Sequence, residues 1–142
     1  MTYRTTASKL KQVGLREGFR SGLEDKVAAQ LKAQGIDPRY EEEKIKYSVP
    51  ARPATYTPDF RLPNGIFIET KGRFVSDDRK KHKLIKEQHP HLDIRFVFSN
   101  AKAVIRKGSK TTYADWCEKY GFKYATKFIP QEWIDEHPVH SP

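Results

Sequence analysis

Residues 57–71 constrain the fold of this chain more than any other segment, because they have the pattern of a β-hairpin. Asn64-Gly65 lies between two runs rich in aromatic and β-branched residues, and we expect both turn residues to take positive φ. The two strands should therefore pair side by side. The period of two on the second strand predicts two faces, with Phe67, Glu69 and Lys71 on one and Ile66, Ile68 and Thr70 on the other.

Two carboxylates and a lysine should meet on this hairpin. Asp59 is expected across the ladder from Glu69, and nine residues separate them along the chain. Carboxylates this close repel unless a cation lies between them, and such oxygen ligands suit magnesium or manganese. Pro58-Asp59 followed by Glu69-x-Lys71 is the spacing of the PD-(D/E)xK motif of metal-dependent phosphodiesterases. The same short pattern also occurs on ordinary exposed strands, but the apolar run 66–68 favours a site.

The length and charge of the chain limit its class. At 142 residues it can form one domain with a modest core, or one arm-exchanged protomer of a compact dimer. Its net charge of +9 indicates a polyanionic partner such as nucleic acid. The single cysteine, Cys117, excludes an intrachain disulfide and suggests a packing role. No apolar run is long enough for a bilayer span or a secretory signal, so we expect a soluble intracellular protein without a membrane partner.

Residues 1–20 form a basic arm, with five lysine or arginine residues and one acid. The arm either contacts DNA or only keeps the protein soluble. Ser21-Gly22-Leu23-Glu24 then matches a capping box, so the first helix should begin there. Val27 and Leu31 continue a buried stripe from Leu23, and Gly35 should end the helix. The capping box already explains Glu24 without any chemistry.

Strands and helices should alternate through the rest of the chain. Residues 40–49 read as a strand, and the prolines of 50–53 make a stiff connector. Ser76 should cap a second helix that ends at His89-Pro90, and 92–99 should form the next strand. A strand, a helix and a strand predict a right-handed crossover and parallel pairing.

Aromatic residues at regular spacing predict the core. Ile94, Phe96 and Phe98 share one face of the strand 92–99. A third helix should be capped by Thr111 or Thr112 and closed by Gly121, and Pro130 should open a final turn. The expected core side chains of these two elements are Tyr113, Trp116, Cys117, Tyr120 and Trp133.

Residues 72–110 carry eleven basic and four acidic side chains, a net charge of +7 immediately after the acidic motif. Such a surface would draw an anionic substrate towards a metal site. A lysine-rich helix face is also an ordinary solvated surface, so the run is weaker evidence than the motif.

The chain resembles the endonuclease I family of T-seven-like bacteriophages, enzymes that resolve Holliday junctions. The similarity runs in the same order from about Arg20 to Trp133. It includes the segments 19–27, 62–67, 77–82 and 87–90, together with Tyr56-Thr57-Pro58-Asp59-Phe60 and Glu69-Thr70-Lys71-Gly72.

This resemblance implies a restriction-endonuclease-like α/β fold, in which a mixed sheet is flanked by helices. It also implies a homodimer whose N-terminal elements are exchanged between subunits. Residues 1–20 would be the basic arm, 21–142 the nuclease domain, and 47–56 an extended bridge between subunits. The substrate would be branched DNA, above all four-way junctions, in the cytoplasm of the phage's host cell.

The resemblance also implies the active site, because Glu24, Asp59, Glu69 and Lys71 match the family's positions. Two Mg²⁺ or Mn²⁺ ions would complete each site, one held by Asp59, Glu69 and the Thr70 backbone carbonyl and the other involving Glu24 of the partner chain. Lys71 would orient the nucleophile or balance charge on phosphorus. One family carboxylate falls at Arg39 here. Either Glu41 or Glu42 replaces this carboxylate, or the carboxylate is dispensable.

The expected DNA contacts are ten basic residues: Lys9, Lys11, Arg16, Arg20, Arg79, Lys80, Lys81, Lys102, Arg106 and Lys107. Two other functions fit the same residues. One is a sequence-specific or end-directed nuclease of the same fold. The other is a catalytically silent DNA-binding protein, in which Asp59 and Glu69 only form salt bridges with nearby lysines.

Overall fold

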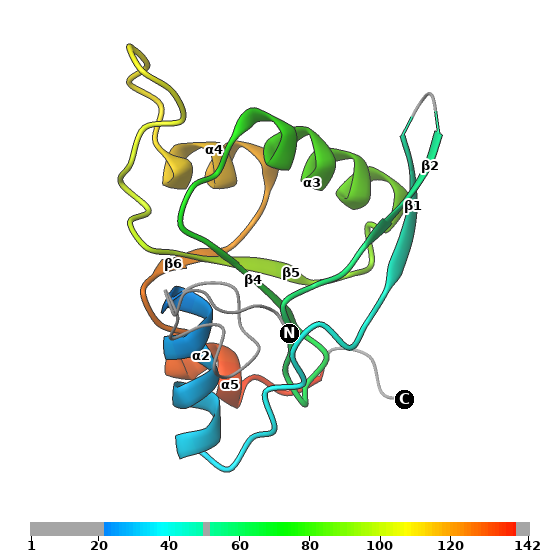
Figure 1. The fold of residues 1–142 in the computed structure, drawn as a ribbon, viewed down its shortest axis with the longest axis vertical. Coiled ribbons are helices and arrows are strands. Elements are labelled where there is room, and N and C mark those ends of the chain that lie inside the picture. The colour runs from blue at the N-terminus through cyan, green and yellow to red at the C-terminus, as the bar shows by residue number, and fades with distance from the viewer. Residues whose placement is uncertain (1–21, 50–51, 139–142) are drawn as a thin grey trace, which may run out of the picture.

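The protein has a mixed α/β fold, in which helices flank a mixed four-stranded sheet (Figure 1). The computed structural model describes residues 22–49 and 52–138. The strands are β3 (Phe60–Arg61), β4 (Phe67–Lys71), β5 (Ile94–Phe98) and β6 (Tyr124–Thr126), in that spatial order. β3 pairs antiparallel with β4, whereas β4, β5 and β6 are parallel. The predicted parallel pairing of the strands around the second helix is confirmed, and β6 adds a strand that the sequence did not predict.

The predicted hairpin forms, but its turn differs from the expected one. Gly65 N donates to Leu62 O at 2.9 Å, and Leu62 N donates to Ile66 O at 2.8 Å, so Pro63 and Asn64 occupy the corners. Gly65 alone takes a positive φ, of 93°, and the expectation of positive φ at Asn64 is wrong. The reason is the register of the turn, because Pro63 and Asn64, rather than Asn64 and Gly65, take its two central positions. The Asn64 amide also donates to Trp133 O at 2.8 Å and to Glu136 O at 3.0 Å.

Helices cover both faces of the sheet (Figure 1). On one face, α2 (Gly22–Ala33) and α5 (Gln131–Asp135) pack on Ile66, Ile68 and Val97. On the other, α3 (Ser76–Gln88) and α4 (Tyr113–Tyr120) pack on Phe67, Phe96 and Phe98. The predicted division of side chains between the two faces is therefore confirmed for the apolar residues. Trp133 is buried, as expected.

Three predicted helix ends follow the sequence signals, and one does not. After α2, Ile36 N donates to Leu31 O and Gly35 takes φ +74°, which is the Schellman arrangement that the glycine predicts. Thr112 caps α4 in a capping box with Asp115, and Gly121 closes that helix with φ +80°. The expected Ser76 cap of α3 is wrong, because Val75 holds the extended N-cap position and Ser76 is the first helical residue. Ser21 lies outside the described residues.

A separate two-stranded sheet joins the first helix to the hairpin. β1 (Ile45–Val49) pairs antiparallel with β2 (Arg52–Tyr56), from Ile45 opposite Tyr56 to Val49 opposite Arg52. The predicted strand 40–49 is too long, because Tyr40 and Glu41 form a turn in which Glu41 takes φ +52°. Pro53 lies within β2. Proline has no N–H to donate, and it is tolerated here because both strands of a two-stranded sheet are edge strands.

An aromatic cluster holds α3 and α4 on the sheet. The Phe74 ring centroid lies 5.0 Å from Phe96, 5.3 Å from Phe98 and 4.8 Å from Trp116. Neighbouring Cys117 is fully buried, and burial raises its pKa to about 12, so the thiol is a packing group as expected. Within the described residues, no helix is both long and apolar enough to cross a membrane.

Phe74→Ala should destabilise the protein by about 3–5 kcal/mol, because Phe74 is fully buried and its removal leaves a cavity among four aromatic rings. The measurement is urea unfolding followed by tryptophan fluorescence. Phe128→Ala is the matched control, since Phe128 is 51% exposed, and it should change the unfolding free energy by less than about 0.5 kcal/mol. Equal losses from both variants would contradict this description of the core.

Candidate active site

Strand β4 places Glu69 and Lys71 near its carboxyl end, between β3 and β5. Phe60 pairs with Ile68 at the start of β3, so continuing the antiparallel register by one step puts Asp59 opposite Glu69. Both carboxylates are 4% exposed, and the charge of Asp59 makes ionisation of Glu69 more costly. The geometry therefore agrees with the expected placement of Asp59 across from Glu69.

Asp59 is held by the residue that follows Glu69. Its Oδ2 accepts from Thr70 N at 2.9 Å and from Thr70 Oγ1 at 2.8 Å. Burial raises the pKa of Asp59, and the two hydrogen bonds from Thr70 oppose that rise. The carboxylate is thus fixed through Oδ2.

Glu69 is bound at both oxygens. Its Oε1 accepts from the Tyr56 hydroxyl at 2.7 Å, and its Oε2 lies 3.3 Å from Lys71 Nζ. Burial, followed by the charge of Asp59, raises the pKa of Glu69 to about 8. Burial alone would lower the pKa of Lys71, but Glu69 and Asp78 outweigh it and hold that pKa above its ordinary value. Lys71 therefore remains a cation beside two carboxylates.

Glu24, Glu41 and Asp59 form a cluster in which one ligand oxygen from each lies within 4.8 Å of the others. Glu24 comes from the first turn of α2, and its Oε1 accepts from the Tyr40 hydroxyl at 2.8 Å. Glu41 reaches the cluster through the turn before β1, where its backbone N donates to Asp59 O at 2.9 Å. Three chain segments that are far apart in sequence thus converge on one point.

The two candidates for the carboxylate missing at Arg39 have different surroundings. Glu41 lies in the acidic cluster, whereas Glu42 pairs with Arg39 at 3.2 Å on the surface. Glu43 also pairs with Arg39, at 3.5 Å. Glu41 takes a left-handed φ of +52°, which Glu42 and Glu43 do not. Three consecutive glutamates in an irregular segment carry no periodic signal that would reveal which of them joins the cluster.

Comparison with known proteins identifies the family. The whole chain, residues 1–142, matches the family model described as Phage endonuclease I. This protein belongs to that family. It is 59% identical over 130 residues to endonuclease I of Escherichia phage T7, covering 92% of this chain and 85% of the relative. It is 58% identical over 118 residues to endodeoxyribonuclease 1 of Enterobacteria phage T3, covering 83% and 78%.

The acidic cluster has the chemistry of a metal site. Glu24, Glu41 and Asp59 offer oxygen donors, the ligand type preferred by hard divalent cations. Asp59 and Glu69 have raised pKa values chiefly because burial disfavours their charge, and a cation between them would remove that penalty. Glu24, Glu41 and Asp59 therefore fit a divalent cation, whereas Glu69, which the sequence also predicts as a ligand, is not one of these three residues.

The predicted DNA contacts fall into three groups. Lys80, Lys102, Arg106 and Lys107 are exposed. Arg79 and Lys81 have structural contacts instead, since Arg79 donates to Phe74 O at 2.6 Å and Lys81 Nζ lies 5.3 Å from the centre of the Tyr56 ring. Lys9, Lys11, Arg16 and Arg20 lie outside the described residues.

The loop after β5 begins at the same end of the sheet as Lys71, because Ser99 N donates to Lys71 O at 3.1 Å. Lys102, Arg106 and Lys107 belong to this loop, which extends away from the body of the molecule (Figure 1). Their charges are therefore carried on a segment anchored beside the carboxylates.

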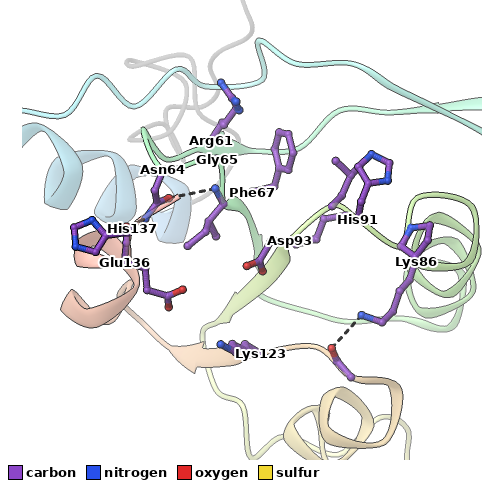
Figure 2. A pocket seen from close by; sticks show the side chains of 15 residues that line it. Arg61, Asn64, Gly65, Phe67, Lys86, His91, Asp93, Lys123, Glu136 and His137 are labelled. Carbon is purple, nitrogen blue, oxygen red and sulfur yellow. Dashed lines mark hydrogen bonds between the residues drawn. The ribbon is translucent and has the colours of Figure 1, made fainter. Parts of the chain in front are cut away.

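A cavity of about 530 Å³ lies at the opposite end of the sheet (Figure 2). Phe67 and Ile94, the first residues of β4 and β5, line it together with Arg61, Lys86 and Lys123. None of Glu24, Asp59, Glu69 and Lys71 does so. The candidate site lies instead towards the carboxyl end of β4, where ligands of open α/β sheets usually bind.

Metal-free protein should lose stability as the pH rises from 5.5 to 8.5. Folded Glu69 has a pKa near 8 against 4.5 for a free side chain, so between these values the folded state holds a proton that the unfolded state has lost. Glu69→Gln mimics the protonated group and should flatten this decline. Thermal unfolding in EDTA at pH 5.5 and pH 8.5 measures the change in melting temperature for the wild type and for Glu69→Gln.

Glu132→Gln is the control for this experiment, because Glu132 lies exposed on α5. It should follow the wild type at both pH values. A decline of melting temperature in Glu69→Gln as steep as in the wild type would contradict the assignment to Glu69.

Proposed function

We propose that this protein is a metal-dependent endodeoxyribonuclease that resolves four-way (Holliday) junctions and other branched DNA. The observation that carries the proposal is the buried carboxylate cluster beside Glu69 and Lys71, in a chain 59% identical to an endonuclease I. DNA cleavage follows from membership of the family. Selectivity for branched substrates rests on the sequence resemblance. The protein would act in the cytoplasm of the host cell.

The proposed metal ligands are the buried carboxylates. Asp59, Glu69 and the Thr70 backbone carbonyl would hold one Mg²⁺ or Mn²⁺ ion, and Glu24 would contribute to a second. Glu41 lies within ligand distance of Glu24 and Asp59, which supports it, rather than Glu42, as the substitute for the carboxylate absent at Arg39. Such ions supply Lewis acidity and lower the pKa of bound water.

Lys71 is the proposed electrostatic residue of the reaction. Its ammonium group lies 3.3 Å from Glu69 and 3.4 Å from Asp78, so it is fixed before substrate arrives. A preorganised cation at this place would orient the nucleophile or stabilise the negative charge that grows on phosphorus. Its raised pKa supports a role as a permanent charge rather than as a general base.

An arm-exchanged homodimer is the proposed assembly of this restriction-endonuclease-like fold. Residues 1–20 would be an arm, 21–142 the nuclease domain and 47–56 the bridge between subunits. Helix α2 packs on the body through side chains, as where Gln30 exchanges hydrogen bonds of 2.7 and 2.9 Å with the Ile129 backbone. If the β1–β2 hairpin opened between Val49 and Arg52, the same contacts could form between two chains.

The basic residues outside the site would bind DNA phosphates. Lys80, Lys102, Arg106 and Lys107 are available on the surface, and the N-terminal arm would add Lys9, Lys11, Arg16 and Arg20. Arg79 and Lys81 are weaker candidates, because their charges already contact other groups.

The test of the proposed function compares two DNA substrates, with and without Mg²⁺. A synthetic four-way junction should be cut in Mg²⁺, while linear duplexes with the same arm sequences should be cut much more slowly. Equal cutting of both would favour a sequence-specific or end-directed nuclease. Binding without any metal-dependent cutting would indicate a catalytically silent DNA-binding protein.

Asp59→Asn and Glu69→Gln should each slow junction cleavage by about 100-fold or more, since loss of a metal ligand removes several kcal/mol of transition-state stabilisation. Junction affinity should stay the same or rise, because each change removes negative charge near DNA. Single-turnover kinetics and gel-shift titration measure the two quantities. Asp77→Asn is the control, because Asp77 is exposed at the start of α3, and it should retain cleavage. Parallel loss of affinity and cleavage in folded protein would count against the site.

A mixed dimer of Glu24→Ala and Asp59→Ala chains tests the exchange. If Glu24 acts on the partner's Asp59, one site of the mixed dimer is intact and the other carries both lesions. The dimer should then nick one strand of a junction, whereas both homodimers are inactive. The two chains should be co-expressed with different tags, since an intertwined dimer exchanges subunits slowly. An inactive mixed dimer would show that each chain builds its own site.

A further inference from the structure

The Tyr56 hydroxyl contacts the candidate site from outside the main sheet. Tyr56 ends strand β2, whereas Glu69 lies on β4. Tyr56 is fully buried, and its hydroxyl donates to Glu69 Oε1 at 2.7 Å. Burial, together with the charge of Glu69, holds the pKa of Tyr56 well above its ordinary value, so the hydroxyl keeps its proton and stays a donor.

This hydrogen bond distinguishes the two oxygens of Glu69. Oε1 is bound in the core by Tyr56, while Oε2 lies 3.3 Å from Lys71 Nζ, whose side chain reaches solvent. Rotation of the carboxylate would break both contacts together. Glu69 therefore presents one defined oxygen, Oε2, towards Lys71.

The ring that carries the hydroxyl is itself fixed. The His82 ring packs edge-on against Tyr56, with centroids 5.0 Å apart at 83°, and against Phe96 at 4.8 Å. Lys81 Nζ lies 5.3 Å from the centre of the Tyr56 ring. Two consecutive residues of α3, Lys81 and His82, thus contact the Tyr56 ring, and Phe96 packs against His82 in turn.

His82 is an unusual choice for this packing role. It is fully buried, and neither ring nitrogen has a hydrogen-bond partner in the part of the chain that the structure describes. Burial, with Lys81 and Lys71 nearby, lowers the pKa of His82 well below its ordinary value, so the imidazole is neutral. An unpaired buried polar group destabilises the folded state. Its ring nonetheless fills the space between Tyr56 and Phe96.

We propose that Tyr56 is a positioning residue of the nuclease site: its hydroxyl orients Glu69 so that Oε2 is ready to bind the metal ion, and His82 and Lys81 hold its ring in place. This inference rests on the proposed function, because it assumes that Glu69 is a metal ligand. A ligand oriented in advance loses less conformational freedom when the ion binds. Removal of such an outer partner of a metal ligand typically weakens metal binding by about 10–100-fold.

The test is the affinity of Tyr56→Phe for Mn²⁺ in the absence of DNA, measured by isothermal titration calorimetry. Phenylalanine keeps the ring contacts with His82 and Lys81 and removes only the hydroxyl. We expect affinity to fall by about 10-fold or more. The Mn²⁺ concentration for half-maximal cleavage should rise by the same factor, and junction affinity in EDTA should change less than about two-fold.

Tyr124→Phe is the matched control, because it removes another tyrosine hydrogen bond to a glutamate, Glu118, at a distance from the site. Its Mn²⁺ affinity should equal that of the wild type. Unchanged Mn²⁺ affinity in folded Tyr56→Phe would overturn the inference.

Glu69→Gln separates failure of the inference from failure of the proposed function. If Glu69→Gln binds Mn²⁺ as tightly as the wild type, the proposed metal site is wrong. If Glu69→Gln loses affinity and Tyr56→Phe does not, only the role of Tyr56 is wrong.

The double variant Tyr56→Phe/Glu69→Gln tests whether Tyr56 acts through Glu69. It should bind Mn²⁺ no more weakly than Glu69→Gln alone, since the two effects are not additive when one residue acts through the other. In Tyr56→Phe alone, the buried Glu69 carboxylate loses its hydroxyl donor, which could prevent folding. The double variant has no carboxylate at position 69, so it remains informative if the single variant does not fold. A further loss of affinity in the double variant would overturn the inference.

Discussion

The burial of negative charge at Asp59 and Glu69 is the constraint on which the surrounding structure depends. A carboxylate with 4% exposure is stable only when donors or cations replace its lost water. Thr70 supplies two donors to Asp59, and Tyr56 and Lys71 supply a donor and a cation to Glu69. Burial still raises the pKa of both groups, to about 8 at Glu69, so their ionisation would become easier if a cation bound beside them.

The fold supplies these compensating groups from several elements. The parallel pairing of β4 with β5 keeps Glu69 and Lys71 on a rigid, buried strand. Helix α2 and the turn before β1 bring Glu24 and Glu41 to Asp59 from the opposite direction. The β1–β2 hairpin then delivers Tyr56. A site held by so many segments is sensitive to how they pack, so changes in the core should reach it through geometry rather than through direct contact.

Local sequence signals were sufficient for much of the fold and part of the site. The hairpin spacing brought Asp59 and Glu69 together, and Gly35, Thr112 and Gly121 mark helix ends where the expected backbone geometry appears. Errors arose where turn register or tertiary contacts override such signals. Asn64 takes an ordinary φ because it shares the central positions of its turn with Pro63, and the strand before Pro50 is shortened because Glu41 turns towards Asp59.

The sequence by itself determined the α/β class, the two faces of β4 and the pair of carboxylates, because these depend on periodicity and on contacts close in the chain. Only the tertiary structure decided that Glu41, and not Glu42, joins Glu24 and Asp59, and that Tyr56 binds Glu69. It also showed that the Arg79 guanidinium donates to two backbone carbonyls, those of Phe74 and Ile105. The physical reason is that each of these contacts depends on how separate elements pack and on the direction of one irregular turn, neither of which has a repeating pattern in the sequence.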